Sequence, residues 1–321
     1  MGSIEQPEWI AGYCIKKETL SDCVERWEYR FQKEYGHIYI CRPWPGVHLW
    51  MNDVYMHSIP TECLEEYHFI KLNYCAEGRS EVLLEDERYV YLEKGILSVD
   101  SNTPKKNFLF PGGRYAGLEL ILDMKVLEKQ PVQAFLDCGI DPKKMREKLE
   151  DMQGSYLACV SGEWKKLAEC VMERLKRADA GAEEYRFFTL QLLYSLKRAD
   201  LVLVEQKFYL TKGQRRIVAS VEEKISGDLK CRYTVESLAK EQGISPSSLK
   251  KYFEKVYGTS ISDYIRRKRM EHACRLLAQT RMSVADIAAE TGYGNQGKFA
   301  GVFKKYTQKT PLEYRRLHSA D

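Results

Sequence analysis

Residues 285–316, "ADIAAETGYGNQGKFAGVFKKYTQKTPLEYRR", contain two helical patterns separated by only four residues, 292–295. Gly292 can adopt the left-handed conformation that ends a helix at little cost, and Asn295 is a favourable N-cap for the pattern that follows. Two helices joined by a short glycine-containing turn form a helix-turn-helix. The stretch therefore predicts this motif, with lysines on the second helix.

The same pattern occurs once more upstream, in residues 234–264, "TVESLAKEQGISPSSLKKYFEKVYGTSISDY". Gly243 matches Gly292 at an offset of 49, and after one inserted residue Phe253 matches Phe303 at an offset of 50. Such self-similarity at a nearly fixed period indicates a repeated structural module. We therefore predict two helix-turn-helix units.

A basic helix of about 18 residues is predicted between the two units, in "ISDYIRRKRMEHACRLLAQT" at residues 261–280. At about 1.5 Å per residue it is roughly 27 Å long, which is comparable with one turn of B-DNA at about 34 Å. One chain could then place both second helices in successive major-groove segments. The basic residues of this helix are Arg266, Arg267, Lys268, Arg269 and Arg275.

The outward faces of the two second helices are the candidate recognition surfaces. The expected buried residues are Leu249, Phe253 and Val256 in the first helix, and Phe299, Val302, Phe303 and Tyr306 in the second. The residues left outward are Ser247, Lys250 and Lys251 in the first helix, and Gln296, Gly297, Lys298, Gly301 and Lys304 in the second. Cationic and small polar side chains suit the major groove, although a solvated lysine face would have the same composition.

The charge distribution favours DNA as the partner. The chain has 50 Lys and Arg against 46 Asp and Glu, a net charge of +4. Residues 211–321 hold 22 basic and 12 acidic residues, a net of +10, whereas residues 1–210 hold 28 and 34, a net of −6. A basic unit joined to an acidic one indicates that one end binds a polyanion.

The N-terminal part changes from strand to helix patterns. Residues 36–123 are rich in β-branched and aromatic residues with frequent turn signals, which predicts an antiparallel sandwich or small barrel. Residues 124–204 read as helices, and the helix at 183–200 is apolar around most of its circumference, either because it is deeply buried or because it forms a dimer interface. The expected domains are 1–204, a linker at 205–213, and 214–321.

The C-terminal part resembles the AraC/XylS family of bacterial transcription regulators. The residues that carry the resemblance are Ile287-Ala288, Gly292-Tyr293, Asn295, Phe299, Phe303-Lys304, Thr310-Pro311 and Tyr314-Arg315. The resemblance implies an all-α domain with two helix-turn-helix units joined by a central helix, and RNA polymerase as a partner. It places base-facing residues at Ser247, Lys250, Lys251, Gly297, Lys298 and Gly301.

The sequence departs from the family pattern in two respects. Gln308 stands where the family usually has glycine, and Gly297 and Gly301 put no side chain where the family generally presents one. Either the backbone approaches DNA unusually closely there, or the second unit supplies phosphate contacts and little base discrimination. The second interpretation is favoured.

The N-terminal part is similar, more loosely, to the cupin-like sensor barrels and dimerisation helices of the family, in the branch that includes the pyochelin-responsive regulator. The complete expected fold is thus α+β, and the resemblance implies a siderophore-like or other aromatic effector. Aromatic surfaces and anion-binding groups that could hold it, or could simply be core residues, are Trp44, Trp50, Tyr55, Tyr74, Arg79 and Arg114.

Other function classes are disfavoured. The ten cysteines occur singly, and His37, His48, His57 and His68 lack the spacing of a metal-dependent cupin enzyme, so no metal or cofactor is expected. No apolar stretch is long enough for a membrane span and no signal-peptide pattern is present, which predicts a cytoplasmic protein. We therefore expect a ligand-responsive, dimeric transcription regulator, more specifically an activator. The alternative is a sensor or scaffold whose helical domain binds protein.

Overall fold

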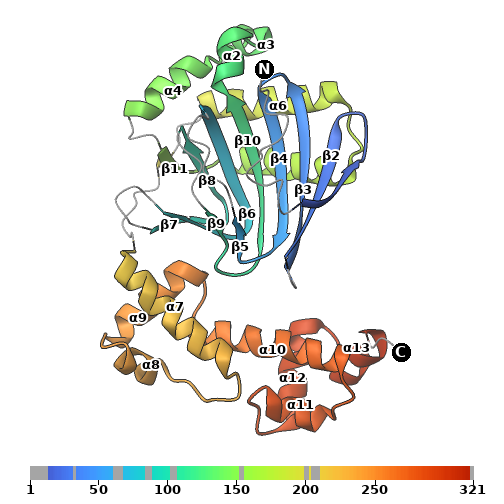
Figure 1. Ribbon diagram of the computed structural model, residues 1–321, viewed down its shortest axis with the longest axis vertical. Coiled ribbons are helices and arrows are strands. Elements are labelled where there is room, and N and C mark those ends of the chain that lie inside the picture. Colours follow the sequence, from blue (N-terminus) through green and yellow to red (C-terminus); the bar gives the residue numbers. More distant parts are fainter. Residues whose placement is uncertain are drawn as a thin grey trace. The chain divides into compact units, whose positions relative to one another are not determined.

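The computed structural model describes residues 14–31, 34–60, 68–83, 89–101, 107–151, 155–198, 202–203 and 210–318. The chain forms two compact units, Met1–Tyr209 and Leu210–Asp321. Most of the predicted linker lies outside the described residues, and its last two residues, Lys212 and Gly213, already belong to helix α7. Figure 1 shows the sheet of the first unit and the helices of the second.

The first unit is built on antiparallel strands. Along the main path the order is β1–β2–β3–β4–β10–β6–β8–β11–β12, while β5, β7 and β9 pair beside it. The strands are β1 (Cys14–Thr19), β2 (Val24–Phe31), β3 (Glu34–Trp44), β4 (Val47–Tyr55), β5 (Ser58–Pro60), β6 (Phe69–Leu83), β7 (Tyr89–Glu93), β8 (Ile96–Asp100), β9 (Asn107–Leu109), β10 (Tyr115–Asp123), β11 (Ser155–Cys159) and β12 (Val202–Leu203).

In the described residues the sheet is antiparallel, as predicted, but it is not closed into a barrel, so the predicted closed barrel is not found and the cupin-like resemblance is not confirmed. Closure requires the first and last strands to pair, but within the described part of the chain the path ends at β1 on one side and at the two-residue β12 on the other. Strand β6 instead bends at Gly78, whose φ is +80°, and pairs with β7 beyond it. An added Cβ at Gly78 would lie 2.0 Å from the Arg114 carbonyl oxygen, so only glycine fits this bend.

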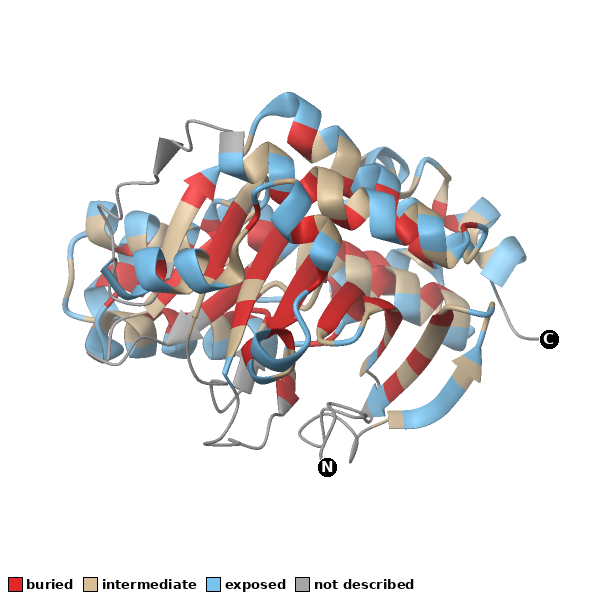
Figure 2. Ribbon diagram, turned by 90° about the horizontal axis from the view of Figure 1, so that it is seen from above, coloured by how far each residue is buried: buried red, intermediate tan, exposed pale blue. Residues whose placement is uncertain are grey.

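Each face of the sheet has its own core, and the central strands β4 and β10 are buried along almost their whole length (Figure 2). One face, with Leu49, Leu72 and Leu120, packs against the helices. The opposite face carries a separate cluster that includes Trp27, Trp50 and Tyr115. The helices of this unit are α2 (Met124–Lys129), α3 (Gln133–Asp137), α4 (Pro142–Asp151), α5 (Gly162–Arg177) and α6 (Ala182–Arg198).

Helix α6 corresponds to the predicted helix at 183–200, of which residues 199–200 lie outside the described residues. Tyr185, Leu192 and Leu193 are buried in the core of the first unit. Phe187 and Tyr194 are 58% and 39% exposed on the same helix. The helix is therefore apolar both on its packed side and on part of its outer side.

The second unit is helical. Figure 1 shows α8 and α9 near one end of the central helix α10, and α11, α12 and α13 near its other end. The helices are α7 (Lys212–Gly227), α8 (Val235–Glu241), α9 (Pro246–Tyr257), α10 (Ile261–Gln279), α11 (Val284–Glu290), α12 (Gln296–Thr307) and α13 (Pro311–His318).

Candidate nucleic-acid interface

The first helix-turn-helix is formed by α8 and α9, and its ends are set by local side-chain chemistry. The Thr234 hydroxyl accepts a hydrogen bond from the Ser237 backbone N–H at 3.1 Å and so caps α8. Gly243, with φ at +65°, turns the chain, and the Ser245 hydroxyl accepts from the Ser248 N–H at 3.1 Å to cap α9. Pro246 occupies the first turn of α9, where its missing N–H costs nothing.

The second helix-turn-helix repeats this construction in α11 and α12. The Ser283 hydroxyl accepts from the Asp286 N–H at 3.1 Å, and the Asn295 side chain accepts from the Lys298 N–H at 2.9 Å. Gly292 turns the chain with φ at +75°. Local capping and glycine signals thus form the same motif twice.

Both motifs are held by an equivalent aromatic contact. The rings of Phe253 and Tyr264 meet edge to face with centroids 5.2 Å apart, and those of Phe303 and Tyr314 do so at 5.5 Å. These are the residues that the sequence repeat aligns, and Phe253 and Phe303 are fully buried. The repeat therefore preserves the packing that holds each second helix against the next element.

Arg269 of α10 anchors loops rather than projecting toward a ligand. Its guanidinium donates hydrogen bonds to the carbonyl oxygens of Leu229 and Cys231, both at 2.9 Å. The predicted basic helix thus contains at least one arginine that joins segments of the fold.

The predicted outward residues are exposed on both second helices. They are Ser247, Lys250 and Lys251 on α9, and Gln296, Gly297, Lys298, Gly301 and Lys304 on α12. The prediction that Tyr306 is buried is wrong, since 46% of it is exposed. The buried side of α12 is narrow and centred on Phe299 and Phe303, and Tyr306 lies beyond its edge.

Of the two unusual glycines of α12, Gly301 has open space around it, whereas Gly297 lies close to the side chain that caps the helix. An added Cβ at Gly301 would meet no atom within 4 Å, and one at Gly297 would lie 3.2 Å from Asn295 Oδ1. No packing contact within the described fold therefore requires glycine at position 301.

The six candidate ligand residues of the first unit are not gathered in one place. Trp50 and Tyr74 are buried in the two different cores of the sheet. The Arg114 guanidinium lies 4.3 Å from the Tyr55 ring centroid. Arg114 also forms ion pairs with Asp53 at 2.7 Å and Glu77 at 2.8 Å.

The remaining two candidates lie in separate surroundings. Arg79 pairs with Glu93 at 3.1 Å. Trp44 lines a groove together with residues of β1 and β2, strands that the sequence did not predict because the strand pattern was recognised only from residue 36 onward.

Across the described ranges, no three His, Cys, Asp or Glu side chains gather in a way that could hold a metal ion. Within the same residues, no helix is both long and apolar enough to cross a membrane.

The helical unit is similar to DNA-binding domains of known transcription regulators. A family model described as a helix-turn-helix domain matches residues 238–317. The transcriptional activator AarP of Providencia stuartii is 32% identical over 105 residues, which are 33% of this chain and 78% of AarP. The probable transcription factor PqrA of Proteus vulgaris is 31% identical over 81 residues, 25% of this chain and 66% of PqrA.

Two further matches are more limited. One covers only a third of the related protein, and the other is to a solved structure with a low TM-score. The transcriptional activator RhaR of Escherichia coli K12 is 30% identical over 96 residues, and the match spans 30% of this chain and only 34% of RhaR. Among solved structures, the C-terminal domain of AraT from Geobacillus stearothermophilus is 29% identical, with 35% of this chain and 90% of that chain covered and a TM-score of 0.31.

The duplicated motif with two exposed recognition helices, together with these sequence relatives, defines a DNA-binding transcription regulator. The chain belongs to the AraC/XylS family.

Proposed function

We propose that the protein is a ligand-responsive transcription activator, in which the helical unit binds operator DNA and the first unit binds a small-molecule effector. The observation that carries the DNA-binding part is the placement of two exposed, lysine-bearing helices near opposite ends of the 19-residue helix α10. That length suits two successive major-groove segments on one face of a duplex.

We assign different tasks to the two recognition helices. On α9, Ser247, Lys250 and Lys251 contact base edges and nearby phosphates. On α12, Gln296, Lys298 and Lys304 contact mainly the phosphate backbone, because Gly297 and Gly301 offer no side chain for base readout. Sequence discrimination then depends mostly on α9.

Two protein partners are proposed, one from the activators among the relatives and one from the exposed aromatic residues of α6. Activation is proposed because AarP and RhaR are named as activators, and it implies contact with RNA polymerase. A homodimer through α6 is supported by the exposed Phe187 and Tyr194 rings on that helix. A bacterial DNA-binding regulator of this kind acts in the cytoplasm and carries out no catalysis.

The test is binding of the purified full-length chain to its own upstream DNA and to a scrambled duplex across a salt series. Specific binding should weaken steeply with salt, with a log–log slope of about −0.9 per phosphate contact. Replacing both Lys250 and Lys251 with alanine should remove the preference for upstream DNA and reduce the slope by up to about 1.8 if both lysines contact phosphate.

The matched control replaces Lys143 and Lys144, an exposed lysine pair on α4 of the other unit. It should leave DNA binding unchanged. If the Lys250/Lys251 variant keeps the affinity and sequence preference of the parent, the assignment of α9 is wrong. Salt-insensitive binding with no preference among duplexes would favour the alternative of a sensor or scaffold that binds protein.

A further inference from the structure

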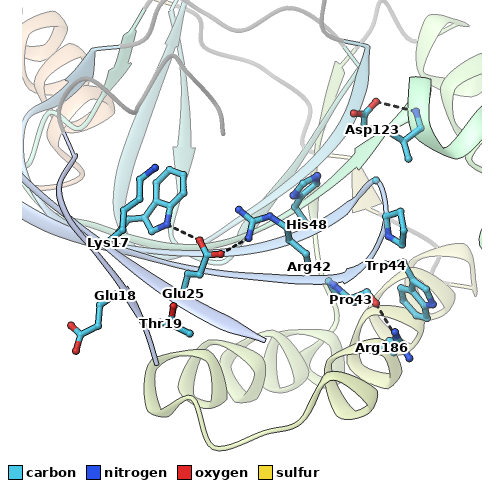
Figure 3. Close-up of a pocket in the computed structure, with 14 residues that line it drawn as sticks. Lys17, Glu18, Thr19, Glu25, Arg42, Pro43, Trp44, His48, Asp123 and Arg186 are labelled. Atoms are coloured by element: carbon cyan, nitrogen blue, oxygen red, sulfur yellow. Dashed lines mark hydrogen bonds and ion pairs between the residues drawn. The ribbon is translucent and has the colours of Figure 1, made fainter. Parts of the chain in front are cut away.

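A groove of about 870 Å³ lies at the end of the sheet where β3 turns into β4. Figure 3 shows Glu25 and Arg42 near its centre, Lys17 on one side, and Trp44 and Arg186 on the other. The lining residues come from β1 to β4 and the β3–β4 turn, from the end of β10, from α2 and from α6. The groove therefore joins the sheet to the helices that cover it.

His48 is the most unusual residue in this lining. It is only 5% exposed, it faces the groove, and its imidazole has no hydrogen-bond partner among the described residues. Its ring nitrogens are not among the fully buried unpaired atoms of the described structure, so they stay open to the groove, where a ligand can form a hydrogen bond with them. Burial, with a smaller contribution from Arg42, lowers the pKa of His48 to about 4, so the ring is neutral at pH 7 and can donate one hydrogen bond.

The cations of the groove have unused binding capacity. Arg42 donates through Nη1 to Glu25 at 2.9 Å, and no other hydrogen bond of its guanidinium is formed with the described residues. The Lys17 ammonium lies 4.1 Å from the Trp27 ring centroid and has no salt bridge in the described structure. Both side chains can therefore accept an anionic partner.

The carboxylates of the groove are already engaged. Glu18 pairs with Arg26 at 2.6 Å, and Glu25 accepts from the Trp27 indole N–H at 2.9 Å as well as from Arg42. Asp123 caps α2 by accepting from the backbone N–H of Lys125 at 3.0 Å. The groups left to bind a ligand are consequently hydrogen-bond donors, most of them positively charged.

The groove also has an apolar end. The Trp44 ring and Val126 line it, and the Trp44 ring is held edge to face against Phe135 at 5.3 Å. A ligand that fits both ends has an anionic head and an apolar body. Inorganic phosphate could use the cationic end alone.

We propose that this groove is the effector site and that the effector is an organic carboxylate with an apolar body. Its carboxylate is held by Arg42, Lys17 and the His48 N–H, and its body lies along Trp44. This inference rests on the proposed function, which supplies the reason for an effector, but the site itself can be tested without DNA.

The test is calorimetric titration of the full-length chain with 3-phenylpropanoate and octanoate, each compared with its uncharged amide, and with inorganic phosphate. Both acids should bind at least tenfold more tightly than their amides, because charged hydrogen bonds supply the difference. Phosphate should bind more weakly than either acid, since it cannot use the apolar end.

Three variants locate the site. Arg42→Gln, His48→Asn and Lys17→Gln should each weaken acid binding about fivefold or more. Lys16→Gln is the matched control, because Lys16 is the neighbouring exposed lysine of β1, pairs with Glu18 and does not line the groove. Lys17 is exposed, so its replacement tests the site even if the buried His48 variant fails to fold.

The outcomes separate this inference from the proposed function. Equal binding of acids and amides, binding of neither, or equal effects of Lys16→Gln and Lys17→Gln would overturn the carboxylate site. If a host-cell extract still alters operator binding in that case, the proposed function stands and the effector binds elsewhere. Tight acid binding lost in the Lys17 variant, with no effect of the acids on operator binding, would support the site and contradict the proposed response.

Discussion

Alanine at Gly292 should destabilise the helical unit more than alanine at Gly243, although the two glycines occupy equivalent positions in the repeat. Both have positive φ, +75° and +65°. A non-glycine residue in the left-handed region costs about 1–2 kcal/mol. At Gly243 an added Cβ meets nothing within 4 Å, so this strain is the whole expected cost.

At Gly292 the added Cβ would lie 2.6 Å from Arg269 Nη2 and 2.8 Å from the Leu229 carbonyl oxygen. These atoms belong to the anchor in which Arg269 binds the carbonyls of Leu229 and Cys231. Moving the guanidinium weakens at least one charge-assisted hydrogen bond, worth about 1.5–3 kcal/mol. The expected total is about 3–4 kcal/mol for Gly292→Ala, against about 1–2 kcal/mol for Gly243→Ala.

Urea denaturation of the full-length chain can resolve this difference. Trp27, Trp44, Trp50 and Trp164 lie in the first unit and residues 210–321 contain no tryptophan, so tryptophan fluorescence does not report on the helical unit. The far-ultraviolet circular dichroism includes the helical unit. Both substitutions should shift the dichroism transition and leave the fluorescence transition in place. Equal shifts for the two variants would refute the argument that Arg269 makes Gly292 the more demanding position.

Three further changes have expected outcomes. Gly301→Ala should stabilise the helical unit by about 1 kcal/mol, because the position is exposed, unobstructed and inside a helix. Its operator affinity should stay unchanged in a filter-binding assay, and a large loss would show instead that the α12 backbone approaches DNA closely. Burial raises the pKa of Asp53, but hydrogen bonds and charges from Lys176 and Arg114 outweigh it and lower the pKa below the ordinary 3.8. The carboxylate therefore contributes stability above that pH and loses it as the pH falls through the lowered pKa. Asp53→Asn should lower the free energy of unfolding by about 2 kcal/mol at pH 7, a value reduced to allow for the half-exposed Lys176. Thermal melts should show a smaller difference in stability between variant and parent at pH 3 than at pH 7. Phe187→Lys should shift the proposed dimer toward monomer in sedimentation equilibrium, while Lys166→Ala on α5 should not; an unchanged dimer would exclude this face of α6 as the interface.

The helical unit could be predicted well because its signals are local. A serine, threonine or asparagine cap and a glycine turn lie within a few residues of the helix end that each defines. The role of Arg269 could not be predicted in this way, since its two carbonyl partners are 40 and 38 residues away in sequence. An arginine that anchors loops and one that contacts DNA have the same appearance in a helical pattern.

The sheet was predicted only in part because strand pairing is not local. A series of short strands separated by turns occurs in closed barrels and in open sheets alike. Whether the sheet closes could therefore not be deduced from the sequence pattern. The edge strand β1, "CIKKET", was missed because it is short and charged, as many edge strands are. The candidate ligand residues Trp50 and Tyr74 had suitable chemistry, but pairing and register place them in different cores.

Helix α6 provides a physical route by which an occupant of the groove could influence the regulator. Tyr185 packs in the core, Arg186 lines the groove, and Phe187 is exposed on the surface proposed for dimerisation. The Arg186 Nε–H donates to the Pro43 carbonyl at 2.8 Å, which ties α6 to the β3–β4 turn. In the proposed site the apolar body of the ligand lies along Trp44, whose ring centroid is 5.8 Å from the Arg186 guanidinium carbon, so an occupant changes the surroundings and the free energy of this connection. A ligand shifts an equilibrium only by the difference between its affinities for the two states. The effector must therefore bind more tightly when α6 is in one position than in another. By linkage, the same free-energy difference must then appear in the affinity for operator DNA.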